Sequence, residues 1–234
     1  MTVIKTNQDV TNTKNEKQRV KLLNFILEQF PQITTLLYAI NPKGNDSVYD
    51  LDIKTYFGEG FIFEEMDGLK FKIGVKSFFQ TNYKQALELY RKTLEFADLK
   101  GGEIVYDLYT GTGTIAQYIA RKAKYVIGIE SVQEAIDAAT AHAKLNGLTN
   151  CNFYCGDMKD IFTEDFIAKH PKPDVLVTDP PRDGMHHKVV EQILKLLPPK
   201  IVYVSCNSAT QARDIALMKD YYEVVKILPV DMFP

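Results

Sequence analysis

The fold is decided by one stretch of the chain, Ile104-Val105-Tyr106-Asp107-Leu108-Tyr109-Thr110-Gly111-Thr112-Gly113-Thr114-Ile115-Ala116. It combines a short apolar strand, a turn with two glycines one residue apart, and the start of a helix. Parallel α/β sheets use this arrangement to present backbone amides to a ligand. The stretch therefore predicts a cofactor-binding loop at the end of a strand.

Two kinds of cofactor fit this loop. Its spacing, Gly111-x-Gly113-x-x-Ala116, is followed about twenty residues later by Glu130, at the end of the next apolar strand. This pattern fits a dinucleotide fingerprint and a methyl-donor site almost equally well. The loop alone leaves both open. Few cations lie near the glycine turn, which favours an adenosine that carries a sulfonium over a nucleotide held through its phosphates.

The rest of the chain repeats the pattern of a strand followed by a helix. This alternation predicts an α/β fold: a doubly wound, mostly parallel, Rossmann-like sheet with helices on both faces. The expected strands cover 103–108, 125–130, 151–155, 173–178, 200–205 and 222–231, and the expected helices cover 114–122, 132–146, parts of 157–169, 187–197 and 208–219. A further helix precedes the sheet; Thr81 or Asn82 caps it, and it ends near Phe96.

The first 74 residues predict a small N-terminal α+β appendage. Residues 1–15 carry no hydrophobic period and are expected to fray, whereas residues 16–30 have helical spacing. Strand patterns joined by turns such as Gly44-Asn45-Asp46 then indicate antiparallel hairpins, with strands at 33–41, 48–56, 61–66 and 69–73. The expected division is an appendage, residues 1–74, and a main domain, residues 75–234.

Bulk composition excludes several classes of function. The net charge of −2 and the pI of about 6.1 argue against a general basic field that coats nucleic acid. No apolar run reaches the roughly twenty residues of a membrane span, and the N-terminus has no signal core, so we expect a cytoplasmic protein that enters no membrane. Three cysteines without Cys-x-x-Cys spacing predict no metal site: Cys151, Cys155 and Cys206.

Acidic residues follow the carboxyl ends of expected strands, where open α/β sheets bind ligands. Glu130 can accept hydrogen bonds from ribose hydroxyls, and Asp157 can accept one from an adenine amino group. Each could instead cap the helix that follows it. In combination with the glycine loop, the sequence favours ligand binding.

Two further motifs lie at the same strand ends. In Asp179-Pro180-Pro181-Arg182 the prolines fix the backbone, which holds the acid at the rim and offers a flat apolar wall to a planar base. Cys206 emerges between Ser205 and Asn207, opposite the glycine loop. Most lone cysteines are buried hydrophobes, but this position makes Cys206 a candidate nucleophile.

Taken together, the motifs resemble those of the RNA uracil-5-methyltransferases. They are the glycine loop, Phe79-Gln80-Thr81-Asn82, Asp179-Pro180-Pro181-Arg182, Ser205-Cys206-Asn207 and Val230-Asp231-Met232-Phe233-Pro234. That family transfers a methyl group from S-adenosylmethionine to C5 of uridine in ribosomal or transfer RNA. The resemblance covers about residues 70–234 and is strongest to the ribosomal-RNA branch, so 23S ribosomal RNA is the expected substrate.

The resemblance implies roles for individual residues. Cys206 would be the nucleophile, and Asp179, Arg182 and Asn207 would contact the substrate or the transition state. The residues expected to bind S-adenosylmethionine are Gln80, Tyr109, Gly111, Gly113, Thr114, Glu130, Asp157 and Asp179. The N-terminal appendage would be an RNA-contacting part, and no metal is implied.

The sequence departs from the family pattern in three places. The pattern continues past Met-Phe-Pro with a His-x-Glu stretch whose glutamate is the base, so a sequence that stops at Pro234 is expected to be a fragment that releases product poorly. The family's N-terminal RNA-binding barrel, and the cysteine cluster of some members, are also missing from it. Asp183 stands where a small residue is expected and adds negative charge near the RNA.

Other functions stay open on the sequence alone. An amino-group methyltransferase could use Asp179-Pro180-Pro181-Arg182 without a cysteine. A donor-binding or RNA-binding module without turnover would need no base, and a dehydrogenase would also use the glycine loop. A cytosine-C5 enzyme is disfavoured because no cysteine follows the two prolines.

Overall fold

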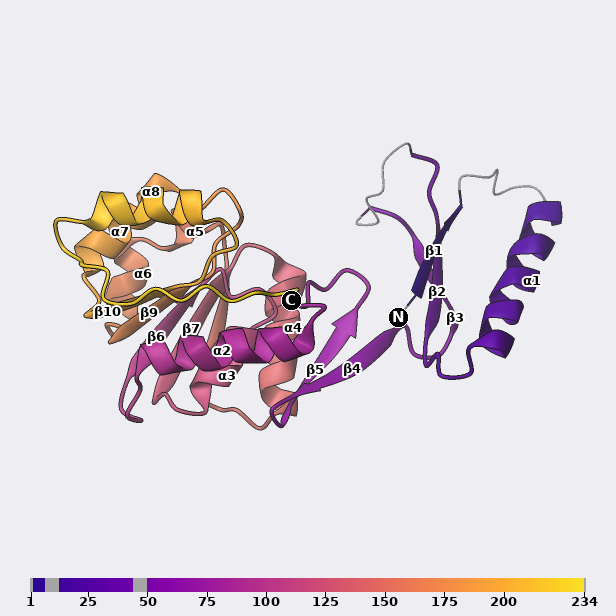
Figure 1. The fold of residues 1–234 in the computed structure, drawn as a ribbon, viewed down its shortest axis with the longest axis horizontal. Helices are drawn as coiled ribbons and strands as arrows, with labels where there is room; N and C mark the ends of the chain where they lie inside the picture. The colour runs from indigo at the N-terminus through magenta and orange to yellow at the C-terminus, as the bar shows by residue number, and fades with distance from the viewer. Residues whose placement is uncertain (1, 7–12, 44–49, 234) are drawn as a thin grey trace. The chain divides into compact units, whose positions relative to one another are not determined.

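The computed structural model describes residues 2–6, 13–43 and 50–233, which form two compact units (Figure 1). Unit 1 comprises Met1–Glu64 and Phe71–Phe79, and unit 2 comprises Glu65–Lys70 and Gln80–Pro234. The two-stranded sheet of β4 (Phe61–Met66) and β5 (Leu69–Gly74) contributes residues to both units.

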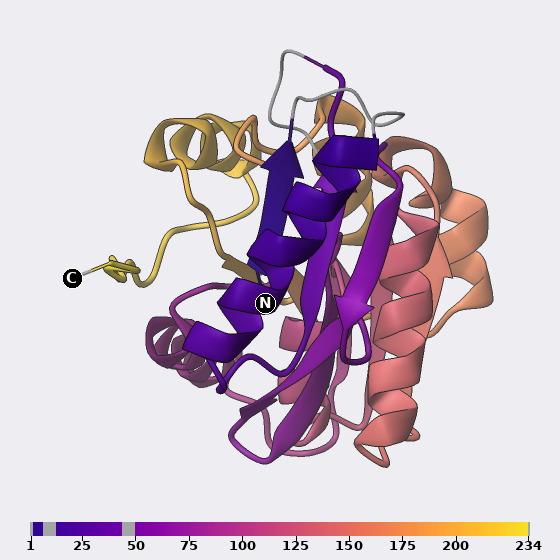
Figure 2. The same ribbon diagram turned by 90° about the vertical axis from the view of Figure 1, so that its right-hand side faces the viewer.

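Unit 1 contains a three-stranded sheet in the order β1 (Thr2–Thr6), β2 (Leu36–Ile40), β3 (Ile53–Phe57). β1 pairs with β2 in parallel, and β2 pairs with β3 in antiparallel fashion. Helix α1 (Thr13–Gln29) connects the parallel strands and covers one face of the sheet (Figure 2). The unit is therefore a βαβ crossover extended by an antiparallel strand.

Two expectations for this unit are wrong. Residues 2–6 were expected to fray, yet they form β1, because the α1 crossover brings them beside β2. Five residues are too few to show a hydrophobic period, so no local pattern indicates this pairing. The strand expected at 48–56 begins at Ile53, and the expected Gly44-Asn45-Asp46 turn lies outside the described residues.

Unit 2 contains a five-stranded sheet in the order β10-β9-β6-β7-β8, in which every pair is parallel. The strands are β6 (Ile104–Leu108), β7 (Tyr125–Glu130), β8 (Cys151–Cys155), β9 (Val175–Thr178) and β10 (Lys200–Tyr203). The chain starts at the central β6, builds outward to β8, and returns to add β9 and β10 on the other side. This confirms the doubly wound α/β sheet and places the reversal of strand order between β6 and β9.

Helices cover both faces of this sheet (Figure 1). One layer holds α2 (Tyr83–Ala97), α3 (Thr114–Ala120) and α4 (Gln133–Leu145). The other holds the short helices between β8 and β9, followed by the last two helices: α5 (Met158–Ile161), α6 (Glu164–Lys169), α7 (His187–Leu196) and α8 (Ser208–Met218). Because both faces are covered, the central strands are buried along nearly their whole length.

The strand expected at 222–231 is wrong, because this segment has no regular secondary structure. It runs alongside α2 in the opposite direction. Lys226 Nζ binds Glu95 near the end of α2 at 2.7 Å, and Asn82 Nδ2, which precedes α2, donates to the Met232 carbonyl at 3.0 Å. The apolar residues gave a strand pattern, but a strand needs a backbone partner, and Val225 is 86% exposed.

None of the helices in the described parts of the chain is both long and apolar enough to cross a membrane. Among the residues with described positions, no group of three or more His, Cys, Asp or Glu side chains is placed to hold a metal ion.

Candidate active site

The residues selected from the sequence lie at the carboxyl ends of neighbouring strands. Backbone hydrogen bonds continue past the strands: the Asp179 amide donates to the Leu108 carbonyl at 3.3 Å, and the Val204 amide donates to the Thr178 carbonyl at 2.9 Å. The loops after β6, β9 and β10 are therefore side by side. Since strand order reverses between β6 and β9, this is where open α/β sheets bind ligands.

The glycine loop after β6 has a left-handed backbone, with φ of 63° at Tyr109, 54° at Gly111 and 75° at Gly113. A Cβ on Gly113 would lie 2.8 Å from that of Ala139, so this position has no room for a side chain. A Cβ on Gly111 would meet no described atom within 4 Å. The backbone at Gly111 is thus open to a ligand.

Glu130 links the glycine loop to the turn before α4, and its contact with a ribose stays a prediction. Its Oε1 accepts from the Ser131 amide at 2.7 Å, the Ser131 hydroxyl at 2.9 Å and the Val132 amide at 3.1 Å. Its Oε2 accepts from the Gly111 amide at 3.1 Å. The carboxylate is therefore fixed beside the glycine loop, and it retains lone pairs for a donor on a ligand.

Asp157 acts as a helix cap in the structure. Its side chain accepts from the Lys159 amide at 3.2 Å at the start of α5, and it forms an ion pair with Lys159 Nζ. The hydrogen bond from Lys159 holds the pKa of Asp157 below its usual value. The capping alternative is confirmed, and contact with an adenine stays a prediction.

Asp107 is a buried acid in the site, only 1% exposed, to which the sequence assigned no role. The Thr110 hydroxyl donates to its Oδ2 at 2.5 Å, whereas Oδ1 has no hydrogen-bond partner among the described residues. Burial raises the pKa of Asp107 to about 7; the Thr110 hydrogen bond opposes the rise and the charge of Asp179 adds to it. The sequence marks Asp107 only as a charged residue inside an otherwise apolar strand.

Asp179 lies close to the same position. Burial raises its pKa to about 6. On the facing helix α2, burial and the charges of Asp179 and Asp107 raise the pKa of Tyr90. Two carboxyl groups and a phenol thus interact where β6 and β9 end.

For three other residues expected to bind the methyl donor, the structure shows burial and neighbouring groups but no contact that indicates binding. Tyr109 is half-buried, and burial raises its pKa to about 12. Thr114 is buried at the start of α3, with its hydroxyl 3.3 Å from that of Thr112. Gln80 is half-buried just before α2. For these three, a role in binding the donor stays a prediction.

Cys206 is an exposed free thiol directly before α8. The next residue, Asn207, caps α8 by accepting from the Ala209 amide at 3.1 Å. The Asn207 Nδ2 also donates to the Arg182 carbonyl at 3.1 Å. The cysteine loop is therefore tied to the Asp179-Pro180-Pro181-Arg182 loop, and the Arg182 side chain is exposed.

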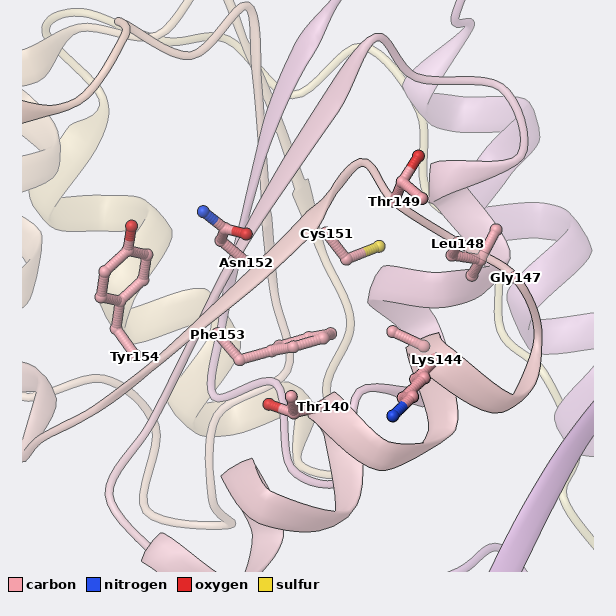
Figure 3. A pocket seen from close by; sticks show the side chains of 10 residues that line it. Thr140, Lys144, Gly147, Leu148, Thr149, Cys151, Asn152, Phe153 and Tyr154 are labelled. Atoms are coloured by element: carbon pink, nitrogen blue, oxygen red, sulfur yellow. The ribbon is translucent and has the colours of Figure 1, made fainter.

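A groove of about 480 Å³ lies away from these strand ends, between the edge strand β8 and the end of α4 (Figure 3). Figure 3 shows Cys151 and Phe153 pointing toward the side of α4, where Lys144 lies. Burial raises the pKa of Cys151 to about 12, so this thiol stays protonated. The ring of Phe153 packs against Gly128 of β7 and Gly113 of the glycine loop, because a Cβ there would lie 2.6 Å and 3.1 Å from it, respectively.

Sequence comparisons place this arrangement among methyltransferases. The model of the methyltransferase domain family matches residues 99–229, more than half of the chain. Two curated relatives named "Uncharacterized RNA methyltransferase" are 56% identical over 214 residues (Bacteroides thetaiotaomicron) and 59% identical over 218 residues (Porphyromonas gingivalis). Each alignment covers 92% of this chain and 47% of the relative. The chain thus spans about half the length of these relatives.

A solved methyltransferase structure is also similar to this chain. The tRNA (uracil-54, C5)-methyltransferase of Pyrococcus abyssi, in complex with S-adenosyl-L-homocysteine, has a TM-score of 0.77 and 28% identity. The match covers 99% of this chain and 52% of that protein. These similarities confirm the resemblance that the sequence motifs indicated. This chain belongs to the family of methyltransferase domains.

Proposed function

We propose that this chain is the catalytic part of an RNA methyltransferase that moves a methyl group from S-adenosylmethionine to C5 of a uridine, with Cys206 bonded to the base during the reaction. One observation carries the proposal: the loop of Asp179 is hydrogen-bonded to the end of β6 on one side and to the Cys206 loop on the other. Methyl donor, planar base and nucleophile need this adjacency to react.

The strand ends fit S-adenosylmethionine, which would supply the methyl group from its sulfonium. That molecule carries an ammonium, ribose hydroxyls and positive charge, all of which match acceptors. Glu130 is fixed beside the loop, Oδ1 of Asp107 lacks a described partner, and the backbone at Gly111 is open. The other predicted binding residues are Gln80, Tyr109, Gly113, Thr114, Asp157 and Asp179. The S-adenosyl-L-homocysteine in the Pyrococcus abyssi enzyme supports this assignment.

The proposed chemistry starts at Cys206, and no residue of this chain is assigned the later role of the base. The Cys206 thiolate adds to C6 of the uracil, which makes C5 a carbon nucleophile able to accept the methyl group. A base then takes the C5 proton, and the bond between sulfur and C6 breaks to release the thiolate. Asp179 and Arg182, whose side chain is exposed, would lie beside the uracil, where hydrogen bonds to it would stabilise charge that develops on the ring.

Which RNA is methylated is a more specific question than which reaction is catalysed. The sequence motifs favour 23S ribosomal RNA, whereas the solved neighbour is named for transfer RNA. We retain ribosomal RNA as the proposed substrate. Parallel assays with unmodified 23S ribosomal RNA and transfer RNA would separate the two, since the preferred RNA gives 5-methyluridine at the lower concentration.

The test measures incorporation of a labelled methyl group into RNA and identifies the product nucleoside. Cys206→Ser should lower incorporation by at least about a thousandfold, because serine is a far weaker nucleophile. Cys155→Ser is the matched control, because Cys155 is also an exposed free thiol, and it should stay within about twofold of wild type.

Two results would overturn the proposal. Methylation that survives in Cys206→Ser would exclude the covalent route and favour an amino-group methyltransferase. A wild-type chain that binds S-adenosylmethionine and RNA but transfers no methyl group would indicate a binding module.

A further inference from the structure

Side chains from the middle of α8 and from the last residue of β10 form a network that the proposed chemistry does not use. At its centre Asp214 is fully buried. Its Oδ2 accepts from the Met185 amide and from the Tyr203 hydroxyl, each at 2.7 Å. Its Oδ1 accepts from the Arg213 guanidinium at 2.7 and 2.9 Å. Among the described residues, the donors to this carboxylate come from the Asp179 loop (Met185), from β10 (Tyr203) and from α8 (Arg213).

The same network fastens the loop after Asp179 at several consecutive residues. The Arg182 carbonyl accepts from Asn207 Nδ2 and lies 3.1 Å from the Thr210 hydroxyl. The Arg213 guanidinium donates to the Asp183 carbonyl at 2.9 Å. The loop that offers a wall to the base is thus held by residues that follow Cys206 in the chain.

Gly184 shows how closely the loop approaches the network. Its φ is 79°, and a Cβ there would lie 2.5 Å from the Arg213 guanidinium and 2.7 Å from Asp214 Oδ2. A side chain at position 184 would push the loop away from the carboxylate. The loop therefore depends on a glycine to make these contacts.

Core packing alone does not account for Asp214. A buried carboxylate is costly to desolvate, and an apolar residue of similar volume would fill the space without that cost. An apolar residue, however, could not hold the Met185 amide and the Tyr203 hydroxyl at one point. The network is built to join three segments in a fixed geometry.

We propose that Asp214 is a positioning residue: through Met185, Tyr203 and Arg213 it fixes the Asp179 loop relative to the Cys206 loop, so that a base held by the first meets the thiol of the second. This inference rests on the proposed attack of Cys206 on a uracil. A misplacement of about 1 Å between reacting groups can lower a rate by about a hundredfold, so a network at this position controls reaction rate more than binding.

The test uses substitutions that remove single polar groups from the network. Asp214→Asn keeps the shape but loses the charge and one acceptor, and Tyr203→Phe removes one donor. Tyr222→Phe is the matched control: the Tyr222 hydroxyl donates to the Pro198 carbonyl at 2.9 Å, at the other end of β10. Thr210→Val removes the hydroxyl near Arg182, and Thr210→Ser restores it.

Two measurements are made on each variant. The first is hydrogen exchange of the amides in segments 182–186 and 205–210, which does not depend on the reaction. The second is the rate at which Cys206 forms an adduct with RNA containing 5-fluorouridine, with the affinities for RNA and S-adenosylmethionine measured separately. Asp214→Asn and Tyr203→Phe should raise exchange in both segments at least about tenfold and lower the adduct rate at least about tenfold, with affinities within about twofold.

The controls and outcomes separate this proposal from the proposed function. Tyr222→Phe and Thr210→Ser should behave as wild type, and Thr210→Val should resemble Tyr203→Phe. Unchanged loop exchange in Tyr203→Phe and Thr210→Val would overturn the positioning role even if Asp214→Asn fails to fold, and so would losses of affinity that match the loss of rate. A wild-type chain that forms no adduct would instead overturn the role of Cys206, and loop exchange would then report on the network alone.

Discussion

At the scale of single residues, Asp107 makes folding depend on pH. Burial raises its pKa from 3.8 to about 7. Between about pH 4 and pH 7 the folded chain therefore keeps a proton that the unfolded chain releases. The free energy of unfolding contributed by this group falls as pH rises through that window and levels off above it. A shift of this size corresponds to at most about 4 kcal/mol.

Asp107→Asn removes this titration. Urea unfolding between pH 4.5 and pH 8 should show stability falling more steeply with pH in wild type than in Asp107→Asn, by up to about 4 kcal/mol across the window. Asp165→Asn, which changes an exposed acid on α6, should keep the wild-type slope. Parallel slopes for wild type and Asp107→Asn would show that the Asp107 carboxyl is not held protonated.

Gly128 tests the close packing beneath the glycine loop. A Cβ there would lie 2.6 Å from the Phe153 ring and 3.0 Å from the Thr110 side chain. Gly128→Ala should lower the free energy of unfolding by about 1–3 kcal/mol, because the core has no room for a methyl group. Gly102→Ala is the control, because its Cβ would meet no described atom within 4 Å. Equal urea midpoints for the two variants would rule out the predicted clash.

At the scale of elements, the Asn82 side chain makes two hydrogen bonds that substitutions can separate. Its side-chain oxygen caps α2 by accepting from the Gln85 amide at 3.4 Å, and its Nδ2 donates to the Met232 carbonyl. Asn82→Asp keeps the capping acceptor and loses the donor, whereas Asn82→Ala loses both. Alanine should therefore cost about 1 kcal/mol of stability and aspartate much less.

Both variants should release the C-terminal segment from α2. We expect faster hydrogen exchange at residues 228–233 in Asn82→Asp and Asn82→Ala, measured by mass spectrometry, because each lacks the donor to Met232. Wild-type exchange in Asn82→Asp would mean that this hydrogen bond does not hold the segment.

The elements also show what a sequence can predict. The parallel strands β6 to β10 could be predicted because strands covered on both faces are continuous apolar runs separated by helical patterns. β1 and the segment 222–231 could not, since β1 is a strand only by pairing with β2, and the segment 222–231 pairs with no strand among the described residues. The local sequence pattern of a segment does not show whether it pairs with a strand that is distant in the chain.

The candidate site also contains residues that local sequence predicts and contacts that it does not predict. Glu130, Asp179 and Cys206 could be chosen because position after a strand is readable in the chain. The pairing of Asp214 with Met185, and the burial of Asp107 close to Asp179, depend on contacts between residues some thirty or more positions apart. These contacts became visible only in the folded structure.

At the scale of the whole molecule, unit 2 holds every residue proposed for donor binding and catalysis. The formal net charge of the chain is −2, so the proposed contact with RNA would come from local groups and not from a general basic field. The central claim is accordingly local: one thiol, Cys206, bonds to one base.

The most direct test of this claim incubates the chain with S-adenosylmethionine and RNA containing 5-fluorouridine, then locates any covalent link by peptide mass spectrometry. Fluorine at C5 cannot leave as a proton does, so the bond between sulfur and C6 should persist. We predict a denaturant-stable adduct at Cys206 that forms in Cys155→Ser and not in Cys206→Ser. RNA binding without an adduct, or an adduct at another residue, would contradict the claim.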